Sequence, residues 1–181
     1  MNDSYPDAYI DYLVEYHATR DYFECHELLE EYWKEHPNDP RAETWVGLIQ
    51  LAVGHYHLRR GNTRGASMLY ANAALRLKED DISRLGIDGD LLLAALKDRR
   101  ILLQAGQTFD YTEMDMRLVD AELRARCETI CLAKGLIWGI KSPMNDPALI
   151  DRHKLRDRTE VIAARAEAVE RKRKSRDQAG F

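Results

Sequence analysis

Residues 45–60 read WVGLIQLAVGHYHLRR, and this stretch decides the fold. Wound as an α-helix at about 100° per residue, it has almost no polar face. A helix that is apolar nearly all round is typical of the middle of a bundle. Gly47 and Gly54 each cost about 1 kcal/mol of helix stability relative to Ala, so another backbone, or a ligand, is expected to approach closely there. The stretch predicts an all-α protein, a helical bundle whose central helix spans about residues 41–60.

The flanking sequence predicts further helices. Asp21 and Glu24 have the spacing of a capping box, which begins a helix that runs to about Glu35. Pro37 and Pro40 bracket a short turn, so this helix and the central one are expected to form an antiparallel hairpin. Other helices are expected over about residues 6–19, 63–77 and 88–104, with a single turn within the linker 78–90.

The segment 112–140 has a different pattern. Met114, Met116 and Leu118 alternate with polar residues, and a helical segment and a short apolar run follow. This order predicts a small strand-helix-strand element, with one longer, ragged helix as the alternative.

The predicted domain organisation has three parts. They are a helical core over 1–106, a mixed or helical appendage over 107–147, and a charged C-terminal helix and tail over 148–181. Within the core, either Asp88 or Asp90 is expected to cap the helix that ends near residue 104.

Composition narrows the class of protein. The chain has 181 residues, a net charge of -4, 45% hydrophobic residues and three cysteines, which fits one folded domain and excludes a disulfide scaffold. The longest strictly apolar run, 91–96, is far shorter than the roughly 20 residues that cross a bilayer. The acidic N-terminus is unlike a secretory signal. We therefore expect a cytoplasmic protein without membrane association.

The C-terminal segment is basic, whereas the rest of the chain is acidic. Residues 151–181 hold ten Lys and Arg against six Asp and Glu, and the residues 171–174 are all basic. Acidic residues interleave with the basic ones and no aromatic residue lies beside the cluster, so a solvated terminal helix is expected and nucleic-acid binding is not.

A polar pair lies within the apolar face of the helix over 22–35. His26 and Glu30 are four residues apart, so they lie one above the other on a helix, and on the helical wheel they fall between Trp33 and Phe23. A carboxylate buried there requires a partner, and His26 is the nearest. Gln50 and His57 share a stripe of the central helix. The predicted hairpin would bring all four residues into one buried pocket.

The same residues carry a resemblance to a known family. It rests on Tyr22-Phe23-Glu24-x-His26-Glu27-x-x-Glu30-x-x-Trp33, then Gly47-Leu48-Ile49-Gln50-x-Ala52, Tyr56-His57 and Arg60-Gly61-Asn62-x-x-Gly65-Ala66. In this order over about residues 20–77 they resemble the bacterial and archaeal helical family catalogued as domain of unknown function 309. The segment from Tyr111 onward resembles the C-terminal extension of longer bacillus-type members. The resemblance implies an all-helical, intracellular protein and no particular activity.

Two functions remain open. His26-Glu27-x-x-Glu30 has the spacing of the zinc-protease helix motif with Glu in the last place, which makes His26, Glu30 and His57 candidate ligands of a divalent metal ion. Gln50 and Glu27 are candidate ligand-binding residues, although Glu27 points about 60° away from Glu30 on the wheel. Alternatively the cluster is a structural hydrogen-bonded network in a non-enzymatic interaction or scaffold protein. A homodimer is a further partner to consider, because symmetric dimers are the commonest assembly.

Overall fold

The computed structural model describes residues 5–106 and 110–155, and this part of the chain is built from helices. The chain divides into two units after Ile150. The helices of the first unit are α1 Asp7–Val14, η1 Glu15–Thr19, α2 Tyr22–Glu35, α3 Ala42–Arg59, α4 Thr63–Arg76, α5 Glu79–Arg84, α6 Gly89–Gln104, α7 Ala121–Lys134 and α8 Pro147–Ile150. The second unit contributes α9, Arg152–Leu155.

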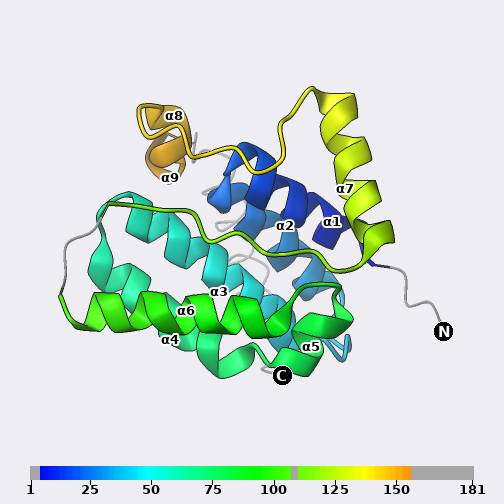
Figure 1. Cartoon of the computed structure of the whole chain (residues 1–181), viewed down its shortest axis with the longest axis horizontal. Helices are drawn as coiled ribbons and strands as arrows, with labels where there is room; N and C mark the ends of the chain where they lie inside the picture. Colours follow the sequence, from blue (N-terminus) through cyan, green and yellow to red (C-terminus); the bar gives the residue numbers. More distant parts are fainter. Residues whose placement is uncertain (1–4, 107–109, 156–181) are drawn as a thin grey trace, which may run out of the picture. The chain divides into compact units, whose positions relative to one another are not determined.

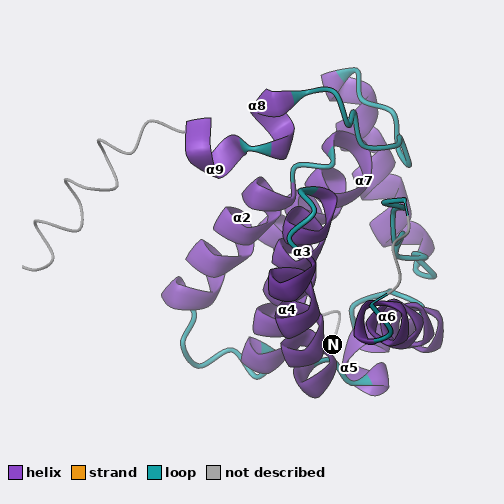
Figure 2. Ribbon diagram, turned by 90° about the vertical axis from the view of Figure 1, so that its left-hand side faces the viewer, coloured by secondary structure: helices purple, strands orange, loops and turns teal. Residues whose placement is uncertain are grey.

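The helix α3 forms the centre of the bundle, as its sequence predicts (Figure 1). It packs against α2 on one side and α4 on another, and most of its side chains are buried. Figure 2 shows α6 along its axis, beside α4. Because α3 has neighbours around most of its circumference, an almost wholly apolar helix is stable there.

Polar side chains cap several of the helices. The Asp21 side chain accepts a hydrogen bond from the amide of Glu24 at the start of α2, as predicted. Asn62, which was not predicted as a cap, accepts from the amide of Gly65 at the start of α4. Between the two candidates for α6, the structure selects Asp88, which accepts from the Leu91 amide at 3.1 Å. These caps satisfy amides that have no partner within the helix.

At the two glycines of α3, the atoms that pack closest belong to side chains, not to another backbone or a ligand. A Cβ added at Gly47 would lie 2.7 Å from Cδ2 of Leu77, and one at Gly54 would lie 2.5 Å from Cε1 of Tyr70. The expectation of close approach is therefore confirmed, but the expectation that a backbone or ligand approaches is wrong.

The alternating segment is extended but does not form a strand. Met114, Met116 and Leu118 are buried, and Asp115, Arg117 and Val119 between and after them are exposed, as the alternation indicates. Glu113 departs from this pattern, because its side chain is only 12% exposed. In the described residues its one pairing is an isolated antiparallel bridge between Leu118 and Ile87. The amide of Met116 instead donates to Nε2 of His17, so it is not available to a neighbouring strand. Figure 1 shows the segment crossing the bundle.

The C-terminal region begins differently from the prediction of one helix from residue 148. The described part consists of two short helices, α8 and α9, with a turn at Asp151 between them. The basic cluster at 171–174 lies outside the described residues. Among the described helices, none combines the length and apolar character needed to cross a bilayer.

Candidate functional site

The predicted polar pair is part of a three-residue cluster on α2. His26 Nδ1 lies 3.0 Å from Oε1 of Glu27, and His26 Nε2 lies 3.6 Å from Oε2 of Glu30. One potential ligand atom from each residue lies within 4.8 Å of the other two. Histidine nitrogen and carboxylate oxygen are ligands suited to divalent transition metals. We call this set the α2 cluster.

The α2 cluster is more exposed than its place on the helical wheel predicts. The side chains of His26 and Glu30 are 27% and 35% exposed, so the prediction of a desolvated site is wrong. The helix buries only the narrow stripe of Tyr22, Cys25 and Leu29. Glu30 has the partner that it requires, because Lys34 Nζ lies 3.1 Å from its Oε2 in addition to the nearby His26.

Two predicted members, His57 and Gln50, have no described contact with this cluster. His57 is half-buried, and its Nδ1 lies 2.9 Å from Nδ2 of Asn62, which follows α3 and caps α4. Burial, with help from the charge of Arg60, lowers the pKa of His57. The side-chain oxygen of Gln50 is buried and has no hydrogen-bond partner within the described residues. No described hydrogen bond connects either residue to the α2 cluster.

A second polar site, which was not predicted from the sequence, surrounds Arg20. The π-helical turn η1 ends at Arg20, whose φ of 58° and ψ of 27° place it in the left-handed region. It is the one described non-glycine residue with positive φ. Such a conformation costs of order 1 kcal/mol for a residue with a Cβ, and strained residues and π-helical turns recur at functional sites.

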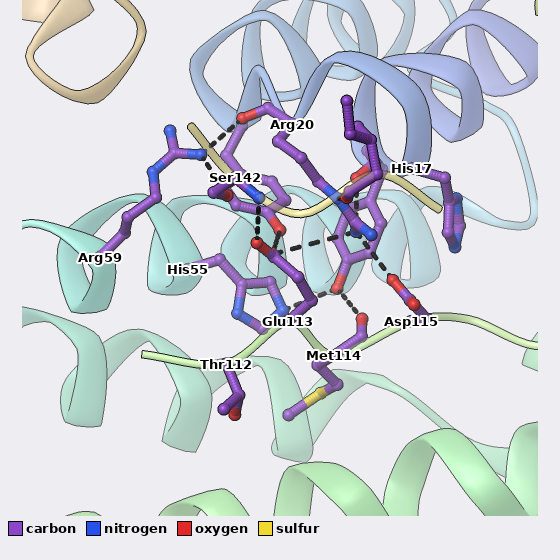
Figure 3. A network of polar contacts seen from close by, with 12 residues as sticks. His17, Arg20, His55, Arg59, Thr112, Glu113, Met114, Asp115 and Ser142 are labelled. Atoms are coloured by element: carbon purple, nitrogen blue, oxygen red, sulfur yellow. Dashed lines mark hydrogen bonds and ion pairs between the residues drawn. The ribbon is translucent and has the colours of Figure 1, made fainter. Parts of the chain in front are cut away.

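The Arg20 side chain is fully buried and ties three segments together (Figure 3). Its Nη1 donates to the carbonyl of Tyr16 at 3.0 Å and pairs with Oδ1 of Asp115 at 2.8 Å. Its Nε donates to the carbonyl of Ile140 at 2.6 Å. Its Nη2 is buried and has no hydrogen-bond partner within the described residues.

Glu113, beside Arg20, is held as a carboxylate by three donors. The Ser142 amide donates to its Oε1 at 2.7 Å, and the hydroxyls of Tyr22 and Tyr111 donate to its Oε2 at 2.5 and 2.9 Å. Burial opposes ionisation, but the hydrogen bonds from Ser142 and Tyr22 and the charge of Arg20 outweigh it and lower the pKa of Glu113. A buried charge is tolerated when it is satisfied in this way.

Beneath this group, His55 lies in a hydrogen-bonded chain with a defined direction. Tyr16 donates its single hydroxyl proton to the carbonyl of Met114 at 2.7 Å, so at 2.6 Å its oxygen accepts from His55 Nε2. His55 Nδ1 then accepts from the Tyr70 hydroxyl, also at 2.6 Å. Burial, followed by the charges of Arg99, Arg20 and Arg59, lowers the pKa of His55. The ring is therefore neutral, with its proton on Nε2.

His17 anchors the segment that crosses this site. Its Nδ1 donates to the Leu13 carbonyl and its Nε2 accepts from the Met116 amide, which defines the neutral ring. Burial, partly opposed by the hydrogen bond with Leu13, lowers the pKa of His17 to about 4. The ring also stacks on Trp138, with ring centroids 4.3 Å apart. The 138–142 segment is thus fixed against η1.

A cavity of about 280 Å³ opens next to these groups. It lies between the end of η1, the extended segment and the loop after α7. Its lining residues are Arg20, Tyr111, Thr112, Glu113, Asp115, Gly139, Lys141, Ser142 and Met144. We call it the Arg20 cavity.

Part of this second site had a signal in the sequence. His55 lies on the same stripe of α3 as Leu48 and Ala52, so its burial could have been deduced from helical spacing. Glu113 and Asp115 are on the polar side of the alternating segment, which identifies an outward face but not its neighbours. Arg20 follows a helix end directly, and nothing in its local sequence distinguishes it from an exposed arginine.

Sequence comparisons relate the chain to proteins described without an activity. Residues 9–69 match the profile of a family described as Domain of unknown function (DUF309). The chain belongs to this family. It is 47% identical over 175 residues to the uncharacterized protein YpuF of Bacillus subtilis (strain 168), a match that covers 96% of this chain and 99% of that protein. No solved structure matches the chain.

Proposed function

We propose that the protein binds a divalent transition-metal ion through the α2 cluster. The observation that supports this function is the approach of one ligand atom each from His26, Glu27 and Glu30 to within 4.8 Å. One imidazole and two carboxylates leave coordination positions for water or for a second molecule. Because the cluster is half-exposed, a cation reaches it without any opening of the bundle.

The charges around the cluster favour a cation of this kind. A bound divalent ion neutralises the repulsion between the Glu27 and Glu30 carboxylates. Lys34 contributes a positive charge 3.1 Å from Oε2 of Glu30. Among first-row metals, an imidazole and carboxylate site binds Zn²⁺ more tightly than Mn²⁺. His57 and Gln50 stay predicted members, since no described contact connects them to the cluster.

The proposal predicts opposite effects for two substitutions on the same helix. Glu30→Gln removes a charged ligand and is expected to weaken Zn²⁺ binding by about tenfold or more. Lys34→Gln removes the cation that competes for Glu30 and is expected to strengthen binding. The measurement is calorimetric titration of the metal-stripped full chain with Zn²⁺ at neutral pH, with melting temperatures of each free protein.

Glu35→Gln is the matched control, because Glu35 is an exposed carboxylate on the same helix outside the cluster. Equal Zn²⁺ affinity of the Glu30→Gln and Glu35→Gln proteins would contradict the proposal. The α2 cluster would then be an ion-pair network in an interaction or scaffold protein, which is the alternative function.

We also propose a cytoplasmic location. The support is that Cys25, Cys127 and Cys131 are all buried free thiols. Unpaired cysteines are typical of proteins from a reducing compartment.

A further inference from the structure

We infer that the outward face of α6 is an interface between two copies of this chain, which pair with their α6 helices antiparallel about a two-fold axis. This surface shares no residue with the α2 cluster, and the pairing needs no metal ion. The inference rests on the width of the apolar face of α6, on the order of large and small side chains along it, and on one pair of opposite charges.

The apolar face of α6 is wider than the part that the described bundle covers. The helix packs against α4 and α5, and its buried side chains include Leu92 and Leu96. Beside this buried side lies a second stripe, whose six members fall within about 100° of one another on the helical wheel. They are Leu91, Ala94, Asp98, Ile101, Leu102 and Ala105, and all are exposed in the described structure. We call this set the α6 stripe.

Five of the six members of the α6 stripe are apolar, although the stripe lies on the outside. Leu91 and Ile101 are 50% and 53% exposed. Figure 2, viewed along α6, shows this helix at the edge of the first unit. A surface helix of a bundle normally has polar residues on its outer side, so an exposed apolar stripe of this kind predicts a further partner.

The order of side chains along the α6 stripe is self-complementary. In the direction of the chain it is large, small, acidic, large and small, at Leu91, Ala94, Asp98, Ile101 and Ala105. When a second α6 runs in the opposite direction and the two helices cross near Asp98, Leu91 faces the partner's Ala105, and Ala94 faces the partner's Ile101. Large against small lets the two helices approach closely, and the two-fold axis repeats each contact. A parallel pair would instead place like against like at every level.

The acidic member of the stripe gains a partner of opposite charge in the same arrangement. Asp98 and its neighbour Lys97 are both exposed, and neither forms an ion pair in residues 5–106 and 110–155. Where the two helices cross, Asp98 lies beside the partner's Lys97, which gives two pairs of opposite charges about the axis. A lipid surface would bury Asp98 without a cation, so this charge favours a second copy of the chain over a membrane.

The length of the stripe determines how strong the pairing can be. A helix rises about 21 Å from residue 91 to residue 105. Stable interfaces bury about 1,200–2,000 Å² in total, and weak, transient ones bury less. A single pair of helices of this length belongs to the weak class, so we expect a dimer whose dissociation constant is in the micromolar range.

The test is sedimentation equilibrium of the full chain, from about 1 μM to about 500 μM, which brackets a micromolar dissociation constant. The buffer contains EDTA, so assembly through a metal ion at the α2 cluster does not contribute, and failure of the metal proposal leaves this result unchanged. We expect the average mass to rise with concentration from one copy toward two. A mass of one copy over the whole range would overturn the inference.

A substitution within the α6 stripe locates the interface. Ile101→Gln removes a large apolar side chain and is expected to raise the dissociation constant by about tenfold or more, with an unchanged melting temperature of the dilute protein. Leu75→Gln is the matched control, because Leu75 has the same size and is 78% exposed on α4, outside the stripe. Equal effects of the two substitutions on the dissociation constant would overturn the inference. So would a lower melting temperature of the dilute Ile101→Gln protein at an unchanged dissociation constant, because the stripe would then be covered within one copy.

Exchange of the two charges tests whether the partner is a second copy of this chain. Lys97→Glu and Asp98→Lys each place like charges about the axis, and each is expected to raise the dissociation constant by about tenfold. The protein with both substitutions restores opposite charges across the axis and is expected to recover the wild-type dissociation constant to within about threefold. Additive weakening in the double variant would show that Lys97 and Asp98 do not meet across the axis, and the antiparallel arrangement would be wrong.

Discussion

Gly54 shows how a single residue sets the packing of the centre. The Tyr70 ring lies against the backbone of α3 at Gly54. The Tyr70 hydroxyl donates a hydrogen bond to His55, the next residue of α3. A side chain at position 54 would displace the ring and break the chain of hydrogen bonds through His55. Gly54 is therefore needed both for the packing of the Tyr70 ring and for the hydrogen bond between Tyr70 and His55.

We predict that the effect of a substitution at Gly54 on stability depends strongly on whether Tyr70 is present. Gly54→Ala is expected to destabilise the fold by about 1–3 kcal/mol, because the added Cβ overlaps the Tyr70 ring. In a Tyr70→Ala background the same substitution is expected to be neutral or stabilising, by up to about 1 kcal/mol from helix propensity. Urea unfolding of the four proteins measures the coupling, and additive effects would refute the close contact.

At the scale of the element, polar side chains define where the helices begin. At α6 the two adjacent acidic residues have different surroundings. Asp88 accepts from the Leu91 amide, whereas Asp90 lies in the first turn, where its charge raises the pKa of Glu79 in α5. The hydrogen bond at Asp88 stabilises α6 directly, whereas the contact between Asp90 and Glu79 includes a repulsion between like charges.

At the scale of this element, Asp88→Ala is expected to lower the free energy of unfolding by about 1 kcal/mol, the usual cost of losing an N-cap. Asp88→Asn retains an acceptor and should recover most of it. Asp90→Ala is the comparison, and its effect is expected to be much smaller. Thermal or urea denaturation decides between them, and equal losses at positions 88 and 90 would show that Asp88 does not act as the cap.

The whole molecule encloses two neutral histidines, His17 and His55, among several arginines. Both have a pKa in the folded protein below the ordinary value of 6.5, for His17 about 4, and burial is the main cause. The unfolded chain therefore binds more protons than the folded chain below pH 6.5. Stability is full above pH 6.5 and is lost as the pH falls from 6.5 toward 4.

For the whole protein, the free energy of unfolding is expected to fall by about 2 kcal/mol between pH 7 and pH 5 because of His17 alone, and His55 adds a loss of the same sign. His17→Gln should remove the His17 part of that loss, about 2 kcal/mol, even though the variant is less stable at pH 7. Urea unfolding at the two pH values measures this difference. His36→Gln, at an exposed histidine, is the control, and an equal pH dependence in wild type and His17→Gln would contradict the assignment.

Helix positions and the central place of α3 were determined by the sequence itself, for local reasons. Caps such as Asp21 act on amides within the same turn, and the apolar circumference of residues 45–58 requires neighbours on every side. The alternation of apolar and polar residues predicted the extended course of the segment around Met116. Each of these properties depends on contacts between residues close together in the chain or on the apolar character of one segment.

Only the tertiary structure decided which polar groups are covered. The helical wheel predicted burial of His26 and Glu30, yet the described residues cover that part of α2 only partly, and the two side chains are 27% and 35% exposed. Arg20 is buried because the segment around Asp115 and the loop at Ile140, both about a hundred residues away in sequence, cover it. In the described residues the segment around Met116 pairs with other backbone at one isolated bridge, and the Met116 amide bonds to the His17 ring. Burial depends on which distant surfaces meet, and a periodic pattern defines a face without specifying what lies against it.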